Sequence, residues 1–254
     1  MEMSSLRINS SSSDYPLCIL SYNSRGFGSD KQEFCKYLMS SSCVGDKLPI
    51  LCNQENFILK GNSYKVRQAF PGFFPLIKPA VKESYNNGRP KNGMFILVPN
   101  SFKNSIVDVS PDNWRIQAAI INLKSSRILL LNTYFPVDRR NLDGNIDEVV
   151  ETIECIQDVI EKESVSQLLL LGDINADFLR NSPHCLQVKR FLIRNNLEQS
   201  WNHFAVDFTH CHQNADVVHL STIDHFFWNE NLHHKITDSL MIISNHHSTD
   251  SIIH

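Results

Sequence analysis

The sequence of 254 residues lacks the features of several specialised classes of protein. It contains no run of eighteen apolar residues, so we predict no transmembrane segment and expect no membrane partner. It has no excess of positive charge, because 24 lysines and arginines face 27 aspartates and glutamates. The net charge of −3 argues against a protein that holds nucleic acid by bulk charge, so any bound polyanion must be met by a local patch or a metal ion.

A disulfide framework and an internal linker are missing as well. The seven cysteines are odd in number and widely spaced, and several lie inside apolar runs, which is typical of reduced core residues in an intracellular protein. No stretch rich in glycine, proline or charge divides the chain, so we expect one domain over residues 15–254. The first fourteen residues are rich in serine and lack the apolar segment of a signal peptide, and we expect residues 1–14 to form a flexible leader.

The most informative stretch is QLLLLGDINAD, at residues 167–177. Its four leucines form an apolar run of strand length, and Gly172 is expected to end the strand with a change of direction. Asp173, Asn175 and Asp177 follow, and their side chains point the same way if the backbone stays extended. Because ligands bind outside the carboxyl ends of strands in open α/β sheets, the segment is a candidate site. The alternative is that these polar residues simply form a turn.

Three other predicted strands lead into polar side chains in the same way. They are LCILSY at residues 17–22, followed by Asn23; PILC at residues 49–52, followed by Gln54 and Glu55; and RILLLNTYFP at residues 127–136, which forms a hairpin with residues 115–123 and carries Asn132 and Tyr134. An isolated buried carboxylate is costly, so a glutamate that ends a core strand must be solvated, paired or bound to a metal. Tyr134 has two interpretations, as a core aromatic residue or as a donor to a phosphate.

The remaining segments alternate between predicted helices and strands. We expect helices after a capping box at Ser29 and Gln32, over residues 143–163, and from Ser182 to the Asn195-Asn196 pair, and strands over residues 64–70, 94–98, 221–228 and 236–243. The loop NNGRPKNG, at residues 86–93, joins two of these strands and carries Arg89 and Lys91. Such a loop is either a solvated turn or a functional loop, and the sequence favours neither.

Taken in order, six motifs resemble those of one known family. SYNSRG, ILCNQENF, LLNTYFP, LLGDINADF, STIDHFFW and SNHH, spread over residues 17–250, resemble the endonuclease/exonuclease/phosphatase superfamily, and most closely the apurinic-type endonuclease domain of non-LTR (LINE-like) retrotransposons. The resemblance implies an α/β fold, a four-layer sandwich of two packed mixed β-sheets flanked by helices. It also implies Mg²⁺-dependent hydrolysis of a DNA phosphodiester, with Mn²⁺ as an alternative ion, that nicks one strand and leaves a 3′-hydroxyl for target-primed reverse transcription.

The resemblance implies a role for each matching polar residue. Glu55 and Asn23 would bind the metal ion, and Asn23, Tyr134 and His246 would contact the scissile phosphate. Asp173 would activate the attacking water, and Asn175 would stabilise the pentavalent phosphorus. Asp224 would lie behind these residues and position them. These residue types suit the chemistry, because a phosphodiester is anionic and repels hydroxide. A cation on a carboxylate neutralises that charge, while histidine and amide groups donate to the oxygens as charge develops.

One position departs from the family's pattern, since Asn245 stands where an S-D-H sequence has aspartate. Asparagine can hydrogen-bond the neighbouring imidazole of His246 but carries no charge to stabilise its protonated form. Two alternatives therefore stay open: a decayed or co-opted retrotransposon domain with little activity, and an apurinic-site repair nuclease or phosphatase of the same superfamily. The expected partners are DNA and a reverse transcriptase domain in a longer polyprotein. We expect an intracellular monomer, in the nucleus where it acts on chromosomal DNA.

Overall fold

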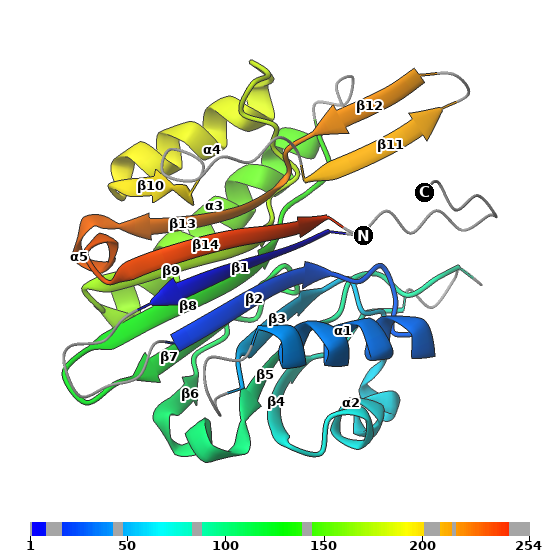
Figure 1. Ribbon diagram of the computed structural model, residues 1–254. Helices are drawn as coiled ribbons and strands as arrows, with labels where there is room; N and C mark the ends of the chain where they lie inside the picture. Colours follow the sequence, from blue (N-terminus) through cyan, green and yellow to red (C-terminus); the bar gives the residue numbers. More distant parts are fainter. Residues whose placement is uncertain are drawn as a thin grey trace.

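Two large β-sheets form the centre of the molecule (Figure 1). The computed structural model describes residues 2–8, 17–42, 48–82, 88–138, 144–200, 209–214 and 217–243. The first sheet contains β1 (Glu2–Ile8), β2 (Leu17–Asn23), β3 (Ile50–Gln54), β4 (Phe73–Lys78), β5 (Met94–Pro99) and β14 (Ile236–Ile243), in the order β14-β1-β2-β3-β5-β4. The second contains β6 (Ile106–Asp108), β7 (Ile116–Asn122), β8 (Arg127–Tyr134), β9 (Gln167–Asp173), β10 (Leu197–Gln199) and β13 (Asp224–Asn229), in the order β10-β13-β9-β8-β7-β6.

Helices and a small third sheet complete the described elements. They are α1 (Ser29–Ser41), α2 (Tyr64–Ala69), α3 (Gly144–Glu163), α4 (Pro183–Arg194), α5 (Glu230–His233), 3-10 helices at Lys60–Asn62 and Asn100–Ser105, and the antiparallel pair β11 (His210–Asn214) and β12 (Val217–Ser221). No helix within the described ranges has the length and apolar character needed to cross a membrane.

Each large sheet contains a single parallel pair of strands among its described pairings. β2 runs parallel to β3, with Asn23 opposite Gln54, and β8 runs parallel to β9, with Tyr134 opposite Asp173. The neighbouring strands are antiparallel. Because parallel strands end at the same edge of a sheet, the polar residues at the ends of these four strands are brought together in pairs.

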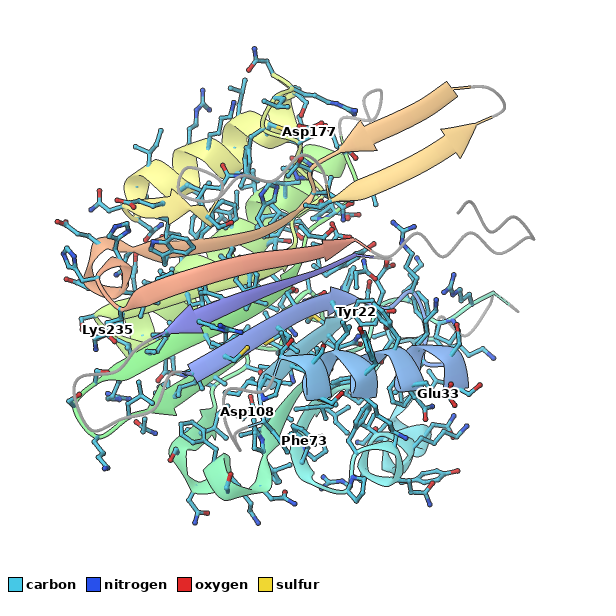
Figure 2. All side chains as sticks on the ribbon, in the orientation of Figure 1. Tyr22, Glu33, Phe73, Asp108, Asp177 and Lys235 are labelled. Carbon is cyan, nitrogen blue, oxygen red and sulfur yellow. The ribbon has the colours of Figure 1, made fainter. Side chains whose placement is uncertain are left out.

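The leucine run of β9 shows why the chain forms four layers. Leu169 and Leu171 belong to the core between the two sheets, whereas Leu168 and Leu170 belong to the core that α3 and α4 cover. On the outer face of the first sheet, α1 and α2 cover a third apolar cluster (Figures 1 and 2). A strand buried on both faces needs a continuous apolar run rather than alternation. The prediction of two packed mixed sheets flanked by helices is confirmed.

A polar network crosses the core between the sheets. The fully buried Gln54 Nε2 donates to Asn132 Oδ1 at 2.6 Å and to Ser21 Oγ at 3.2 Å, and Asn132 Nδ2 donates to Asn53 O at 3.3 Å and to Gln117 Oε1 at 3.4 Å. Gln54 and Asn132 therefore tie β3 to β8 rather than pointing into a site at their strand ends. The network fixes the strand ends that precede Glu55 and Tyr134 relative to each other.

The predicted leader is wrong for its described part. Glu2–Ile8 form β1, which pairs with β2 on one side and with β14 on the other. Leu6 and Ile8, spaced two apart, are fully buried in the core between the sheets. The serine content hid this alternation, and residues 9–14 lie outside the described part of the chain. Five cysteines (Cys18, Cys35, Cys52, Cys155 and Cys185) are free and four of them are buried, as predicted, whereas Cys43 and the Cys211 side chain lie outside the described part of the structure.

The strand predicted over residues 64–70 is also wrong, because Tyr64–Ala69 form α2. Val66 and Phe70, four residues apart, are both buried against the first sheet, so a helical spacing was mistaken for alternation. The helix after Ser29 is confirmed, but its capping box is not, since Gly28 is the N-cap and Gln32 Nε2 donates to Phe27 O instead.

Two boundaries and one strand also differ from the prediction. Gly172 lies inside β9, which runs on to Asp173; its φ of +128° marks a local distortion rather than the end of the strand. The strand predicted over residues 221–228 is divided, since Ser221 ends β12 and β13 begins at Asp224. β4 (Phe73–Lys78) was not predicted. The helices over residues 143–163 and after Ser182 and the hairpin of β7 and β8 are confirmed.

Candidate active site

The polar strand ends meet where the two sheets approach each other. Asn23, the last residue of β2, donates through Nδ2 to Glu55 Oε2 at 2.9 Å and to Asp173 Oδ2 at 2.8 Å. Glu55 follows β3 directly, and Asp173 is the last residue of β9, so one amide group joins both sheets. The oxygen of the same amide, Asn23 Oδ1, accepts from the backbone nitrogen of Arg25 at 3.1 Å. Side chains separated by up to 150 residues in sequence are therefore held at hydrogen-bonding distance.

Asp173 lies among like charges. Its side chain is almost fully buried, and β13 places Asp224 directly opposite it in the sheet. Burial, the carboxylate of Asp224 and the carboxylate of Glu55 raise the pKa of Asp173 well above its usual range, although hydrogen bonds from Asn23 and the Asn175 backbone oppose the rise. A buried carboxyl group whose pKa is raised in this way is typical of a functional site.

The Tyr134 phenol faces the same carboxylates. Burial raises its pKa above the usual range, and the neighbouring Glu55 and Asp173 raise it further, because a phenolate beside them would be repelled. Tyr134 is also hydrogen-bonded to Glu55. The phenol therefore stays protonated at neutral pH and acts as a hydrogen-bond donor. Of the two interpretations of Tyr134, the structure favours a polar group of the site.

A short loop after β9 completes this side of the site. Asn175 adopts a left-handed conformation, with φ of 52°, so the backbone is not extended as predicted. Its nitrogen donates to Asp173 Oδ1 at 3.0 Å, and its Nδ2 donates to Phe135 O at 2.9 Å. The polar residues after the leucine run do make a turn, but the turn presents Asp173, Asn175 and Asp177 to one cleft.

His225 fixes this loop from behind. Its Nε2 lies 2.9 Å from Ala176 O and 3.2 Å from Thr222 O, and because both are acceptors Nε2 carries the proton. Its Nδ1 accepts from Gln199 Nε2 at 2.9 Å. Burial lowers the pKa of His225 to about 4, so the imidazole is neutral in the folded protein. His225 is a buried structural residue that the sequence did not single out.

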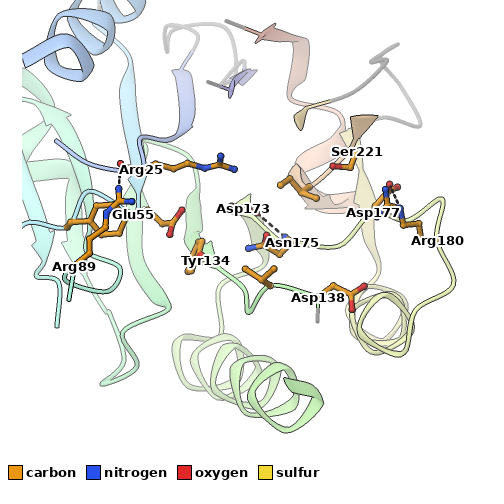
Figure 3. A pocket seen from close by; sticks show the side chains of 13 residues that line it. Arg25, Glu55, Arg89, Tyr134, Asp138, Asp173, Asn175, Asp177, Arg180 and Ser221 are labelled. Atoms are coloured by element: carbon orange, nitrogen blue, oxygen red, sulfur yellow. Dashed lines mark hydrogen bonds and ion pairs between the residues drawn. The ribbon is translucent and has the colours of Figure 1, made fainter. Parts of the chain in front are cut away.

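Glu55, Tyr134, Asp173 and Asn175 line a cleft of about 440 Å³ (Figure 3). The charged residues that line it are Arg25, Glu55, Arg89, Asp138, Asp173, Asp177 and Arg180. Figure 3 shows Arg25 and Arg89 on the Glu55 side and Arg180 at the opposite end, where its Nε pairs with Asp177 Oδ2 at 3.1 Å. Four carboxyl groups line the cleft beside three arginines, and one bound divalent cation would give the cleft a net positive charge.

Backbone strain is concentrated in this cleft. Arg25, Glu55, Phe57 and Asn175 line it and have φ values between 46° and 57°, in the left-handed region that side chains other than glycine rarely adopt. Each such residue costs on the order of 1–3 kcal/mol and persists only where the surrounding structure requires it. The chain therefore maintains strained turns where they aim side chains into the cleft.

The donor set fits a divalent cation. The pKa of Asp173 is raised partly by Asp224 and Glu55, a repulsion that a cation would relieve. No group of three or more histidine, cysteine, aspartate or glutamate side chains in the described residues is arranged to hold a metal ion. Glu55 and Asp173, both hydrogen-bonded to Asn23, present two carboxylates, and Mg²⁺ binds one or two carboxylates and takes its other ligands from water and substrate. The nitrogen of the Asn23 amide, rather than its oxygen, faces Glu55, so Asn23 orients the carboxylate, and metal binding by Asn23 itself stays a prediction.

The structure thus brings together most of the predicted site residues. Asn23, Glu55, Asp173 and Asp224 form one polar cluster, and Tyr134 and Asn175 line the adjoining cleft. Asn245 and His246 lie outside the described residues, so their roles stay predictions. The sequence did not assign Arg25, Phe57, Asp138 or Arg180 to the site. The three-residue spacing between Asp177 and Arg180 was the available signal for one of them.

Comparisons with known proteins agree with this geometry at the level of the fold. The structure is similar to the endonuclease domain of TRAS1, a telomere-specific non-LTR retrotransposon (TM-score 0.57, 16% identity, 84% of this chain and 85% of that chain). It is similar to the AP endonuclease LMAP from Leishmania major (0.65, 13%, 84% and 79%). It is also similar to the 3′ phosphatase NExo from Neisseria (0.58, 16%, 84% and 86%). No protein-family model matches the sequence, and no curated protein matches it.

Proposed function

We propose that this chain, which has the fold of the endonuclease/exonuclease/phosphatase superfamily, is a Mg²⁺-dependent phosphodiesterase that nicks one strand of DNA. Mn²⁺ is an alternative ion. Water attacks phosphorus, the bond from phosphorus to the 3′ oxygen breaks, and the products are a 3′-hydroxyl and a 5′-phosphate. As in a non-LTR retrotransposon, the 3′-hydroxyl would prime reverse transcription by a polymerase domain of a longer polyprotein.

The two hydrogen bonds of the Asn23 amide are the observation that supports this proposal most strongly. They hold Glu55 and Asp173, from different sheets, side by side at 2.9 and 2.8 Å from one nitrogen. Two carboxylates in such proximity repel each other unless a cation or a proton lies between or beside them. A bound Mg²⁺ would neutralise charge on the phosphodiester and polarise its oxygens. Glu55 would hold the ion, and Asn23 would keep the Glu55 carboxylate in place.

The remaining groups can accept the proton of the attacking water and donate hydrogen bonds to the phosphate. Asp173 has a raised pKa and can take a proton from the attacking water, which an ordinary carboxylate does poorly near neutral pH. The protonated Tyr134 phenol can donate to a phosphate oxygen. Asn175 and His246, which the resemblance places beside the phosphate, would donate as negative charge develops there. The leaving 3′ oxygen takes its proton from solvent.

The charges of the cleft favour a polymeric substrate. Arginines lie at both ends of the cleft, and the carboxylates of Glu55 and Asp173 lie between them (Figure 3). A nucleic-acid strand that places one phosphate at the carboxylates would extend a neighbouring phosphate toward Arg25 and Arg89, whereas Arg180 at the other end already pairs with Asp177. This arrangement suits cleavage inside a strand better than removal of a terminal phosphate.

Incubation of the purified protein with supercoiled plasmid and Mg²⁺ tests the proposal. We expect conversion to open-circular plasmid, with nicks that a DNA polymerase extends directly because they carry 3′-hydroxyl ends. EDTA should stop the reaction, and Mn²⁺ should restore it. Plasmid that stays supercoiled with either ion, or nicks that need end repair before extension, would contradict the proposal.

Asn245 favours a second candidate, a folded domain that has lost most of its activity. In the Asp–His pair of serine proteases the same change lowers turnover by about 10⁴. If wild type fails to nick and Asn245→Asp nicks, the decayed copy is supported. Whether or not wild type nicks, we expect Asn245→Asp to raise the nicking rate by at least about tenfold. An equal rate for the two proteins would show that this position does not govern the His246 imidazole. Preference for an abasic duplex would favour a repair nuclease, and release of a 3′-terminal phosphate would favour a phosphatase.

A further inference from the structure

We propose that Arg89, stacked on Phe57, binds a phosphate that flanks the scissile phosphate of the cleaved strand. The inference rests on the proposed function and adds a second phosphate site on the Glu55 side of the cleft. The sequence left open whether the loop that carries Arg89 is a solvated turn or a functional segment. Its attachment to the protein favours the second interpretation.

The end of the loop that follows Arg89 is fixed to the segment that carries Glu55. The backbones of Val81 and Lys91 exchange two hydrogen bonds, at 3.0 and 2.9 Å. Phe57 N donates to Asn92 O at 2.8 Å, and the residue before Phe57 donates through its nitrogen to Gly93 O at 3.0 Å. Gly93 lies so close to the Glu55 segment that an added Cβ would sit 2.5 Å from the Asn56 side chain. Arg89 therefore starts from a backbone position that is set relative to Glu55.

The guanidinium of Arg89 is also oriented. Its Cζ lies 3.7 Å from the centroid of the Phe57 ring, and its Nη2 donates to the carbonyl oxygen of Arg25. Gly26 lies beside the stack, since a Cβ there would be in van der Waals contact with both partners, 3.7 Å from Arg89 Nη2 and 3.8 Å from the Phe57 ring. The backbones of Arg25 and Phe57 are both in the strained left-handed region. Two strained residues and a glycine thus form a platform for one arginine.

The N–H groups of Arg89 that bond no described residue indicate a phosphate. Arg115, Arg180 and Arg194 each pair with a carboxylate, whereas no carboxylate of the described residues pairs with Arg89. A guanidinium has five N–H groups in a planar fork that matches phosphate, and stacking holds the plane while its edge stays available. Arg89 lines the same cleft as Glu55, so a phosphate that it binds belongs to the strand that passes the carboxylates. Such a contact would select a polynucleotide over a terminal phosphate.

Binding without cleavage measures this contact. A fluorescein-labelled 20-base-pair duplex is titrated by anisotropy in EDTA against wild type, Arg89→Ala, Arg89→Lys and the control Arg127→Ala. Arg127 is exposed at the amino end of β8, the end remote from Tyr134, so the control removes the same charge away from the cleft. We expect Arg89→Ala to weaken binding by about tenfold and to reduce the salt slope by about one, Arg89→Lys to lie between, and Arg127→Ala to change affinity by less than about twofold.

Duplexes with one neutral methylphosphonate at a flanking position identify the phosphate. At one position the substitution should weaken wild-type binding by about tenfold and leave the affinity of Arg89→Ala unchanged. Equal losses for both proteins at every position, or wild-type affinity of Arg89→Ala, would overturn the inference. Plasmid nicking by wild type with Mg²⁺ is measured on the same preparations, with thermal unfolding as the check that each variant folds. If the inference about Arg89 fails but wild type nicks normally, the proposed function stays intact. If wild type neither binds the duplex nor nicks plasmid, both the inference and the proposed function are overturned.

Discussion

The neutral imidazole of His225 predicts a specific dependence of stability on pH. The ring is buried, donates through Nε2 to Ala176 O and accepts at Nδ1 from Gln199. Its folded-state pKa is about 4, against 6.5 for a solvated histidine. Between these values the unfolded chain binds a proton that the folded protein does not. Stability contributed by the neutral ring is thus complete above pH 6.5 and is lost as pH falls toward 4.

The size of the effect follows from the two pKa values. Relative to pH 7.5, proton binding to the unfolded state removes about 2 kcal/mol of unfolding free energy at pH 5 and about 3 kcal/mol at pH 4. Because the imidazole holds the backbone of Ala176, the loop that carries Asn175 and Asp177 should loosen over the same interval. We therefore expect activity to fall with stability as the medium is acidified.

Urea unfolding of wild type and His225→Gln at pH 7.5, 6 and 5 measures the effect. Other groups also titrate, so the quantity to compare is the difference between the two proteins at each pH. His225→Gln should be the less stable protein at pH 7.5, and its disadvantage should shrink by about 2 kcal/mol at pH 5. The exposed His234 supplies the control, since His234→Gln should follow wild type throughout. A difference between His225→Gln and wild type that does not change with pH would refute the reasoning.

Two further predictions concern the end of β9. An alanine Cβ at Gly172 would lie 2.0 Å from Thr133 O at a φ of +128°, so Gly172→Ala should lower the unfolding free energy in urea titrations by about 3 kcal/mol or more. The control Gly61→Ala, where no atom lies within 4 Å of the added Cβ, should change it by less than about 1 kcal/mol. Equal effects of the two substitutions would contradict the close approach of β8 and β9 at Gly172. Asp173→Asn should abolish nicking. Because the raised pKa of Asp173 makes its ionised form unfavourable in the folded state, the same substitution should raise the melting temperature in EDTA at pH 7.5 by about 3 °C, and this gain should vanish below pH 4. A lower melting temperature for Asp173→Asn at pH 7.5 would contradict the raised pKa.

The apolar pattern predicted the centre of the fold well. The leucine run of β9 is buried on both faces because helices cover one side and the other sheet covers the second. Local sequence is sufficient in such a case, since any continuous apolar run bounded by turn residues needs two covered faces. The polar residues after β2, β3 and β9 were placed at strand ends correctly for the same reason.

Features that depend on distant partners could not be predicted in this way. β1 is a strand because β14, at the other end of the chain, and β2 lie on either side of it. Gln54 and Asn132 look like further site residues in sequence, yet they bond each other in the core once the two sheets have packed. The choice between helix and strand for Tyr64–Ala69 depended on burying Val66 and Phe70 against the first sheet. In each case tertiary contacts decide between local alternatives that the sequence leaves balanced.

The candidate site, too, was predicted from local sequence only in part. Motif order located Asn23, Glu55 and Asp173, but their hydrogen bonds and the charge of the cleft follow only from the packing of two sheets. The left-handed turn at Asn175 replaced the extended backbone that the prediction assumed. Arg89 gained its interpretation from the Phe57 ring beneath it, which lies in a different segment of the chain.

The carboxylate of Glu55 offers the most direct test that this cleft is an active site. Glu55→Gln keeps the size of the side chain and an oxygen that can accept from Asn23, but removes the charge that would hold a divalent cation. The control Glu151→Gln removes the same charge from an exposed position on α3. In single-turnover plasmid nicking with Mg²⁺, we predict that Glu55→Gln slows the reaction by at least about a hundredfold while Glu151→Gln matches wild type. Nicking by Glu55→Gln at the wild-type rate would contradict the account.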